Sequence, residues 1–540
     1  MFAVVFMVFL PTLRNGFVDW DDTDNFLRNP NYRGLGWANL KWMFTTLHFG
    51  HYQPLSWVTL GFDYLWAQRV YGDGMNPRAY HLTNNLLHAV NAVLVFLLVL
   101  RLFGAAGVRG LWPALLPATW AALAFGVHPL RVESVAWVTE RRDVLSALFL
   151  LVTVLLYLRA HESPERSRRW LALSLLTFTL SLLSRAIAVS LPVILLVLDW
   201  YPLQRIGHER GWLRRAVRGV WLEKLPFLVL AMAAALIAPL AQHEASALLP
   251  LSAHPIITRA AQACYGLVFY VRKTIMPFGL SPIYELHLPL DLLSFRYSVP
   301  ALLVAFGIIA VILNRKRQPA LAAAAAAYVI LLLPVLGFVQ SGNQEVADRY
   351  SYLPSIAVVL LLTGVGLTFW RRGGEGPAAS AALALVGVGA LGALCVRTES
   401  QCRVWRDTAA LWTHAAQVSP DSSLALNGYG YVLLESGRAA EAVECFRRSI
   451  RIQPVNDKAH YNLWTALARL NRTDEMVQAC RDALRWMPYS SRAHCILAEG
   501  LERQGHPGEA EQHYREALTL DPQYARAQAG LARVVQTRRG

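Results

Sequence analysis

Charged residues are scarce in this chain, and long apolar runs take their place. Only 16% of the 540 residues are charged and 55% are hydrophobic, whereas an average soluble domain has about 25% charged residues. This scarcity excludes an ordinary soluble globular protein. A membrane-spanning helix needs roughly 20 mostly apolar residues, and such runs recur from the N-terminus to about Cys395. The sequence therefore predicts an all-α polytopic membrane bundle followed by a soluble C-terminal tail.

Cysteine is also sparse, and its spacing shows no metal or disulfide pattern. The six cysteines include no CxxC pair, and only Cys395 and Cys402 lie close together in the sequence. This excludes the common structural zinc motifs and a disulfide framework. A cleavable signal peptide is not expected, because the apolar run from Met1 to Leu13 lacks a charged start and an AxA-like cleavage site.

A single basic face is missing as well, although the net charge is +15. A nucleic-acid-binding domain would gather its Lys and Arg residues on one soluble surface. Here they form four clusters between apolar runs: Arg159 with Arg166, Arg168 and Arg169; Arg205 with Arg210, Arg214, Arg215 and Arg218; Arg315 with Lys316 and Arg317; and Arg371 with Arg372. Short basic loops mark the cytoplasmic side of a membrane. The charge thus predicts topology and argues against a nucleic-acid partner.

About eleven spans are predicted. They cover residues 1–18, 82–100, 112–127, 144–158, 170–184, 187–201, 222–240, 298–313, 320–338, 353–370 and 378–396. With a cytoplasmic N-terminus, the basic clusters face the cytoplasm, and the acidic loop, the loops 128–143 and 241–297 and the tail face outward. Residues 256–278 could also span. Their three basic residues, Arg259, Arg272 and Lys273, favour an amphipathic or re-entrant helix at the outer surface.

The tail contains an internal repeat. Three sets of positions recur with a period of 34 residues: Pro420, Pro454, Pro488 and Pro522; Gly437, Asn471 and Gly505; and Ala442, Met476 and Ala510. This period, with small residues inside helices and Pro at the repeat end, is the tetratricopeptide pattern. The sequence therefore predicts a membrane domain at 1–397 and an α-solenoid of tetratricopeptide repeats at 398–540, with 525–540 as a capping helix.

The first outward loop begins with an acidic stretch, FVDWDDTDNFLRNP (17–30). N-capping of a surface helix would explain one or two of its acids. It does not require Asp21 and Asp22 side by side at a membrane exit, where a carboxylate tuned by a second one could act as a general base. From this stretch alone, both interpretations stay open.

A polar stripe begins the second span, in the stretch HLTNNLLHAVN. His81, Asn84, Asn85, His88 and Asn91 share one helical face. Polar groups at this depth line a wet cavity or hold neighbouring helices together. Five on one stripe favour the cavity wall.

Two further outward loops carry charge at span mouths. HPLRVESVAWVTERRD contains His128, Glu133 and Arg141, and GNQEVADRYSYLP contains Arg349 and Tyr350. Surface ion pairs or an interfacial anchor would explain them plainly, but Arg at such a position can also bind a phosphate. On the predicted topology, all four polar clusters open on the same side, which predicts one shared cavity.

Together these motifs resemble those of the transmembrane and tetratricopeptide-repeat (TMTC-type) proteins. The stretches that carry the resemblance are WDDTDNFLRNP, QPLSW, AYHLTNNLLHAVN, HPLRVESVAWVTERRDVLSALF, AVSLPVILLVLDWYPL and ADRYSYLP. The resemblance implies the GT-C fold and a glycosyltransferase that uses a polyprenyl-phosphate sugar, as in protein O-mannosylation. It also implies that an acid of the first outward loop is essential, a role that falls on Asp21 and Asp22. Relatives often read Ser-Lys-Pro where this chain reads Ser184-Arg185-Ala186.

The predicted reaction moves a sugar from a polyprenyl-phosphate donor to an acceptor hydroxyl on the outer side of a bacterial inner membrane. Asp21 or Asp22 serves as the base, and Arg349, Arg185 and Arg141, in that order, are candidates to bind the donor phosphate. The predicted cavity or substrate-binding residues are His81, Asn85, His88, His128, Glu133 and Tyr350.

No cofactor or metal-ligand set is predicted, although Asp21 and Asp22 could hold a divalent cation. The repeats, placed in the periplasm, would bind a protein or peptide acceptor. The main alternative is a non-enzymatic scaffold that displays repeats for an envelope assembly, and a transporter ranks third.

Overall fold

The computed structural model describes residues 1–207, 212, 217–244, 248–372 and 377–539. The chain divides into two compact units, a membrane unit (Met1–Pro282 with Leu286–Asp407) and a repeat unit (Ile283–Glu285 with Thr408–Gly540). In the described part of the chain, helices dominate and the only strands are β1 (Tyr284–Glu285) and β2 (Gln344–Val346). The predicted all-α class is confirmed.

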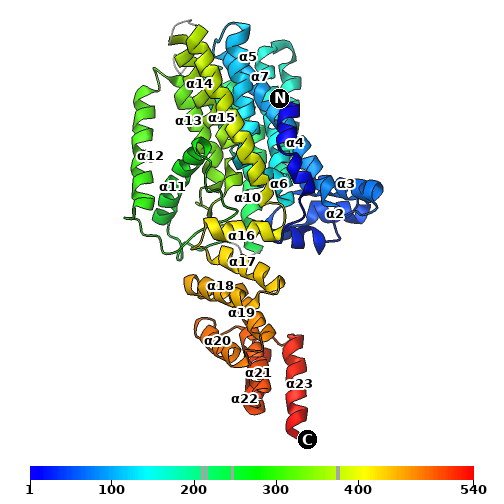
Figure 1. Ribbon diagram of the computed structural model, residues 1–540. Helices are drawn as coiled ribbons and strands as arrows, with labels where there is room; N and C mark the ends of the chain where they lie inside the picture. Colours follow the sequence, from blue (N-terminus) through cyan, green and yellow to red (C-terminus); the bar gives the residue numbers. More distant parts are fainter. Residues whose placement is uncertain (208–211, 213–216, 245–247, 373–376, 540) are drawn as a thin grey trace. The chain divides into compact units, whose positions relative to one another are not determined.

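The described residues of the membrane unit form fifteen labelled α-helices, the strand β2 and several short 3-10 or π turns. The α-helices are α1 (Phe2–Val8), α2 (Trp37–Thr45), α3 (Pro54–Tyr71), α4 (Pro77–Ala105), α5 (Leu111–Gly126), α6 (Val132–Ala136), α7 (Arg141–Glu162), α8 (Ser167–Ser184), α9 (Leu191–Trp200), α10 (Arg218–Glu244), α11 (Ile256–Ile275), α12 (Phe295–Asn314), α13 (Pro319–Leu332), α14 (Pro354–Arg372) and α15 (Pro377–Val404). In Figure 1, α4, α5, α7, α14 and α15 run alongside one another in a bundle, and α4 packs against α5 and α7.

Four described helices are long and apolar enough to cross a membrane. They are α4, residues 138–162 around α7, α10 and α12, and the bent pair Leu111–Gly126 with Pro129–Ala136 could add a fifth. Shorter apolar helices cover Ala186–Trp200, Pro319–Val335 and Pro354–Thr368. The chain is therefore a multi-pass membrane protein, and several of its apolar runs form helices shorter than a full span.

The predicted first span is not one continuous helix. Helix α1 ends at Val8, and a 3-10 turn follows from Leu10 to Arg14 with a proline, Pro11, near its start. Proline has no N–H to continue the helical ladder, so the chain turns before the acidic stretch. The segment 256–278, which the sequence left ambiguous, forms α11, with Arg259 and Lys273 buried in the membrane unit.

The repeat unit is a series of helical hairpins. Its α-helices are α16 (Thr408–Val418), α17 (Ser423–Glu435), α18 (Ala439–Ile452), α19 (Asp457–Arg469), α20 (Thr473–Trp486), α21 (Ser491–Arg503), α22 (Pro507–Leu520) and α23 (Ala525–Arg539). Each packs against the next one along the chain. Consecutive hairpins thereby bury one shared core, in which Ala442, Met476 and Ala510 are buried together.

The 34-residue period has a local physical cause. Ser422, Asn456 and Ser490 each accept a hydrogen bond at the start of a helix, from the N–H three residues later, as N-cap residues do. The turn inside each hairpin needs a left-handed residue, and Gly437, Asn471 and Gly505 supply it with φ of 81°, 56° and 78°. Glycine and asparagine tolerate this conformation best.

Candidate functional site

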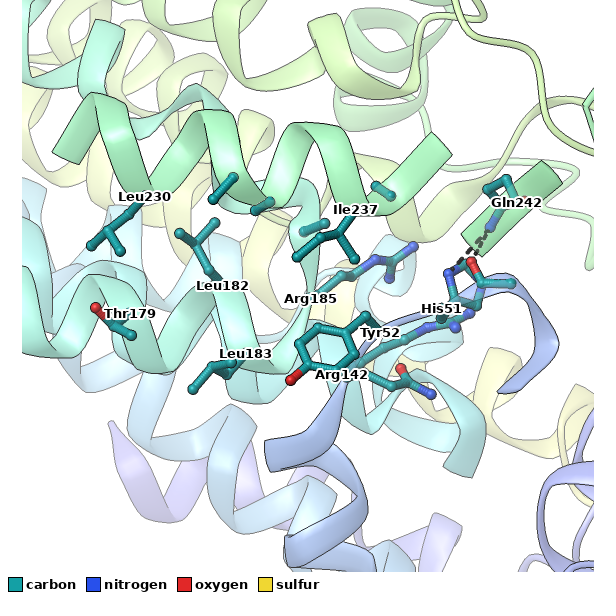
Figure 2. A pocket seen from close by; sticks show the side chains of 16 residues that line it. His51, Tyr52, Arg142, Thr179, Leu182, Leu183, Arg185, Leu230, Ile237 and Gln242 are labelled. Carbon is teal, nitrogen blue, oxygen red and sulfur yellow. Dashed lines mark hydrogen bonds between the residues drawn. The ribbon is translucent and has the colours of Figure 1, made fainter. Parts of the chain in front are cut away.

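An elongated pocket lies between α8 and α10 in the membrane unit (Figure 2). Its side walls are largely apolar: Leu182 from α8 points toward Leu230 and Ile237 from α10, and Leu183 also lines the pocket. One end of the pocket is polar: there Arg142 and Arg185 lie close to the loop that carries His51. The remaining lining residues are Gly50, Tyr52, Gln53, Thr179, Ala186, Ala233, Ala234, Ala238 and Gln242. The pocket is therefore amphipathic along its length.

One carboxylate organises the cationic end of this pocket. Glu140, which is fully buried, lies 2.7 Å from Arg142, 2.5 Å from Arg185 and 3.4 Å from the Nε of Arg349. Asp143 forms a second ion pair with Arg185. Glu140 ends a 3-10 turn, and α7 begins at the next residue.

Arg349 contacts Glu140 but does not line the pocket. Its guanidinium pairs with Glu133, bonds to the side chain of Gln344 and packs over the rings of Trp137 and Tyr350. Burial alone would lower the pKa of Arg349, but the nearby Glu133 carboxylate raises it above the usual value. Arg349 is therefore a permanent cation that holds Glu133 in place.

One carboxyl group of the acidic stretch is buried in the membrane unit. Asp22 is 1% exposed and accepts hydrogen bonds from the Thr139 hydroxyl at 2.7 Å, the Thr139 N–H at 3.3 Å and the Val18 N–H at 3.0 Å. Burial raises the pKa of Asp22 to about 7, even though the hydrogen bonds from Thr139 and Val18 lower it. A carboxyl group with this pKa can accept or release a proton near neutral pH.

The other acids of the stretch have different surroundings. Asp21 is half-buried, and its charge adds to the raised pKa of Asp22. Asp19 accepts from the Thr23 hydroxyl at 2.7 Å, and Asp24 pairs with Arg28 at 3.1 Å on the surface. Both contacts join two side chains, and the N-cap position of the turn Thr23–Leu27, Asp22, makes no side-chain capping bond.

Asp22 and the pocket meet through neighbouring residues and not by direct contact. Neither Asp21 nor Asp22 lines the pocket. Thr139, which binds Asp22, is followed in the chain by Glu140, which binds Arg142 and Arg185. The buried acid is thus fixed to the segment that orients the cationic end of the pocket.

The polar stripe of α4 is buried in helix–helix contacts. Asn84 donates to Val135 O, Asn85 to Phe9 O and Asn91 to Val144 O. The ring nitrogens of His88 lie 2.7 Å from the Tyr352 hydroxyl and 2.8 Å from Gly126 O, and His81 is fully buried in the same stripe. None of these five residues lines the pocket. The contacts of Asn84, Asn85, His88 and Asn91 hold α4 against its neighbours.

Two further predicted residues lie in similar internal networks. His128 Nδ1 accepts from Leu130 N–H at 3.2 Å, and its Nε2 lies 3.0 Å from Thr274 O. Arg141 points away from its neighbour Arg142 and pairs with Asp63 at 2.5 Å and with the side chain of Asn84. Of the three predicted phosphate-binding arginines, the structure places Arg185 in the pocket and Arg141 and Arg349 outside its lining.

Sequence reasoning missed His51 and Arg142 as pocket residues. Arg142 belongs to the charged loop 128–143, but the sequence does not show that Arg142, and not its neighbour Arg141, lines the pocket. His51 carries no motif. Gln242 from α10 approaches it, with Nε2 2.6 Å from Gly50 O and 3.4 Å from the His51 ring. Burial and then the charges of Arg142 and Arg185 hold the pKa of His51 well below its usual range, so the imidazole is neutral.

Comparison with known proteins shows similarity over most of the chain. This chain is 25% identical to the protein O-mannosyl-transferase Tmtc1 of Drosophila melanogaster. The match covers 85% of this chain and 62% of that protein. It is 23% identical to the protein O-mannosyl-transferase TMTC3 of Mus musculus over 78% of its length and 46% of that protein. A stretch of 185 residues, 32% of the chain, is 33% identical to 18% of Drosophila Tmtc2. The chain thus spans less than two thirds of these relatives.

Models of the tetratricopeptide repeat match residues 405–457, 430–490 and 491–524. Among solved structures, the first such domain of human RPAP3 is 22% identical, covering 22% of this chain and 92% of that one with a TM-score of 0.21. A crystal structure of MamA is 16% identical, covering 24% and 75% with a TM-score of 0.22.

Proposed function

We propose that this chain, a TMTC-type protein with tetratricopeptide repeats, is an integral membrane glycosyltransferase. It transfers a sugar from a polyprenyl-phosphate donor to an acceptor hydroxyl. The observation that carries the proposal is the amphipathic pocket, whose apolar walls lead to two arginines held by buried carboxylates. The names of the relatives make mannose the first candidate sugar and a protein the first candidate acceptor.

The pocket matches the two chemical halves of such a donor. Arg142 and Arg185 present N–H groups that suit phosphate oxygens, while the walls from α8 and α10 suit an isoprenoid chain. The outer side of α10 carries exposed apolar residues, including Val229 and Leu236 at 65% and 68%, so a long tail can continue into the bilayer. Arg349 supports this site indirectly, because it fixes Glu133 and contacts Glu140.

Asp22 is the proposed base, with Asp21 as the neighbour that raises its pKa. The acceptor oxygen attacks the anomeric carbon and gives its proton to the Asp22 carboxylate. The bond between the anomeric carbon and the phosphate oxygen breaks, its electron pair stays on the phosphate, and the anomeric carbon inverts. The raised pKa of Asp22 supports this role, because a base is most effective when its pKa lies near the working pH.

The repeats are the proposed binding surface for a protein acceptor, since stacked helical hairpins present a continuous surface to a peptide. The predicted topology, with a cytoplasmic N-terminus, places the reaction and the repeats on the outer side of a bacterial inner membrane. Cavity roles for Asn85, His88 and His128 remain proposals of lower rank, because these side chains make contacts between helices. The same rank is given to His81, which is fully buried.

The first test separates chemistry from donor binding in detergent-solubilised protein with radiolabelled polyprenyl-phosphate mannose. Asp22→Asn should lower transfer by about 10²–10⁴ and leave donor binding intact. Arg185→Gln should weaken donor binding itself. The matched controls are Asp19→Asn and Arg28→Gln, which remove a carboxylate and a guanidinium from the exposed part of the same stretch. Normal transfer by Asp22→Asn would exclude the base role, and unchanged donor binding by Arg185→Gln would exclude the pocket.

A further inference from the structure

Two histidines and a glutamate meet on the surface of the repeat unit. His494 lies on α21, and His513 and Glu516 lie one turn apart on α22. The two Nδ1 atoms are 3.1 Å apart, and Glu516 Oε2 lies 3.0 Å from His494 Nδ1 and 2.8 Å from His513 Nδ1. Among the described residues, this is the only group of three such side chains close enough to share one metal ion.

The repeat architecture explains His494 and the carboxylate of Glu516, but not His513. One repeat period apart, His460, His494 and Gln528 place a side-chain nitrogen 2.9, 3.2 and 2.8 Å from the carbonyl oxygens of Pro454, Pro488 and Pro522. This position therefore serves to tie down the end of the preceding repeat.

The partner positions repeat only in part. One period before His513 and Glu516 the chain has Ala479 and Asp482. Asp482 accepts a hydrogen bond from Gln478 at 3.2 Å, as Glu516 does from Gln512 at 3.1 Å, so the carboxylate recurs. No second imidazole is available beside His460, and the architecture does not require His513.

The hydrogen bond to the proline carbonyl prepares His494 as a ligand. If Nε2–H donates to Pro488 O, the Nδ1 lone pair faces His513 and Glu516. Glu516 is held similarly, because its other oxygen, Oε1, accepts from Gln512 at 3.1 Å. Two imidazole nitrogens that face each other repel unless a proton or a cation lies between them.

We propose that His494, His513 and Glu516 form a binding site for a divalent transition metal such as Zn²⁺. Two imidazoles and one carboxylate are a common donor set for this ion, and ligands 2.0–2.1 Å from it would be about 3.3 Å apart. The observed separations are slightly shorter. The side chains are 12%, 24% and 40% exposed, so a fourth position is open to water or to a ligand from a bound partner. The ion would clamp α21 to α22.

The test uses the full-length protein in detergent, with any polyhistidine tag removed and bound metal stripped with a chelator. Co²⁺ is the probe, because tetrahedral Co²⁺ absorbs visible light far more strongly than the hydrated ion. We expect one Co²⁺ per chain, displaced by Zn²⁺, and a higher unfolding midpoint of α21 and α22 with Zn²⁺. His513→Ala and Glu516→Gln should abolish the spectrum, and Gln512→Ala should weaken binding about 10–100-fold. His460 is the equivalent of His494 one repeat earlier, and the His460→Ala variant should bind Co²⁺ like the wild type.

Three outcomes would overturn the proposal. They are the absence of saturable Co²⁺ binding to the wild type, equal binding by the wild type and Glu516→Gln, and loss of binding in His460→Ala. Glu516→Gln keeps the size of a partly exposed side chain, so its result stands even if His513→Ala unfolds. None of these measurements depends on sugar transfer, so the metal site and the proposed enzyme activity can fail independently.

Discussion

The two units use charged side chains in opposite ways. In the repeat unit, Arg438 and Glu441 form a 2.6 Å ion pair with both side chains more than half exposed, at 53% and 58%. In the membrane unit, Glu140 is fully buried among Arg142, Arg185 and Arg349. Exposed pairs contribute little to stability because water already solvates both ions. A buried cluster depends on every member, because removal of one leaves another charge without a partner.

The difference indicates where each unit derives its stability. The repeat unit has an apolar core shared between hairpins, with residues such as Phe446 and Leu467 fully buried, and its surface charges are replaceable. The membrane unit places charges beside a pocket, and the stability of each buried charge there depends on its partners of opposite charge. Such retained buried charge is typical of functional sites, where a ligand replaces one of the partners.

Glu140→Gln should give the largest effect on this comparison. It keeps the shape of the side chain but removes one carboxylate from the cluster around Arg142, Arg185 and Arg349. We expect destabilisation of the membrane unit by about 3–5 kcal/mol and a loss of donor binding. Hydrogen exchange resolved by peptide would show faster exchange around the pocket. Unchanged exchange there would mean that Asp143 and Glu133 neutralise the cluster without Glu140.

The pH dependence of the two units should have opposite signs, with an effect of intermediate size. The pKa of Asp22 is raised from 3.8 to about 7, so between these values the folded protein holds a proton that the unfolded chain releases. Stability from this group is therefore complete below about 4 and is lost as the pH rises through about 7. Sugar transfer should increase over the upper part of the same range, because the ionised form of Asp22 is the proposed base.

In the repeat unit, the hydrogen bond from Arg533 lowers the pKa of Glu502. Its stabilising contribution is present above the usual pKa of 4.5 and is lost on acidification. Unfolding of each unit, followed by hydrogen exchange from about pH 2 to pH 8, would compare the two signs, because the Glu502 contribution changes only below its usual pKa of 4.5. Asp22→Asn should remove the dependence near pH 7 from the membrane unit alone. A dependence that survives in this variant would have to come from another group.

Glu441→Gln should have the smallest effect. It breaks the exposed pair with Arg438. In the wild type, water already reaches both ions of this pair. We expect no measurable change in the unfolding midpoint of the repeat unit at physiological salt. A clear decrease would show that exposed pairs also support the hairpins, and the contrast between the units would be weaker than the burial suggests.

Most of the fold was predictable where the sequence is periodic. The period of 34 residues placed Gly437, Asn471 and Gly505 at one structural position, and the structure shows the left-handed turn that all three share. The resemblance to TMTC-type proteins was also predictable from ordered motifs, and the comparisons confirm it. Helix lengths were less predictable, because a proline such as Pro11 ends a helix within an apolar run that looks continuous.

The candidate site was predictable only in part. The charged loop marked the right region, but Arg141 and Arg142 are adjacent and their side chains leave the helix start in different directions. One pairs with Asp63 and the other lines the pocket. His51 reaches the pocket from a loop without a distinctive pattern. Contacts of this kind depend on tertiary packing, which leaves no trace in residue spacing.

The caps and left-handed turns of the repeat unit make its length adjustable. Ser422, Asn456 and Ser490 start helices through bonds to residues three positions away, so the instructions for each hairpin lie inside that hairpin. Duplication of one 34-residue segment would insert a complete module and leave the others with familiar neighbours. Gene duplication could therefore change how far the proposed acceptor-binding surface extends in steps of one repeat, while the pocket in the membrane unit keeps its sequence.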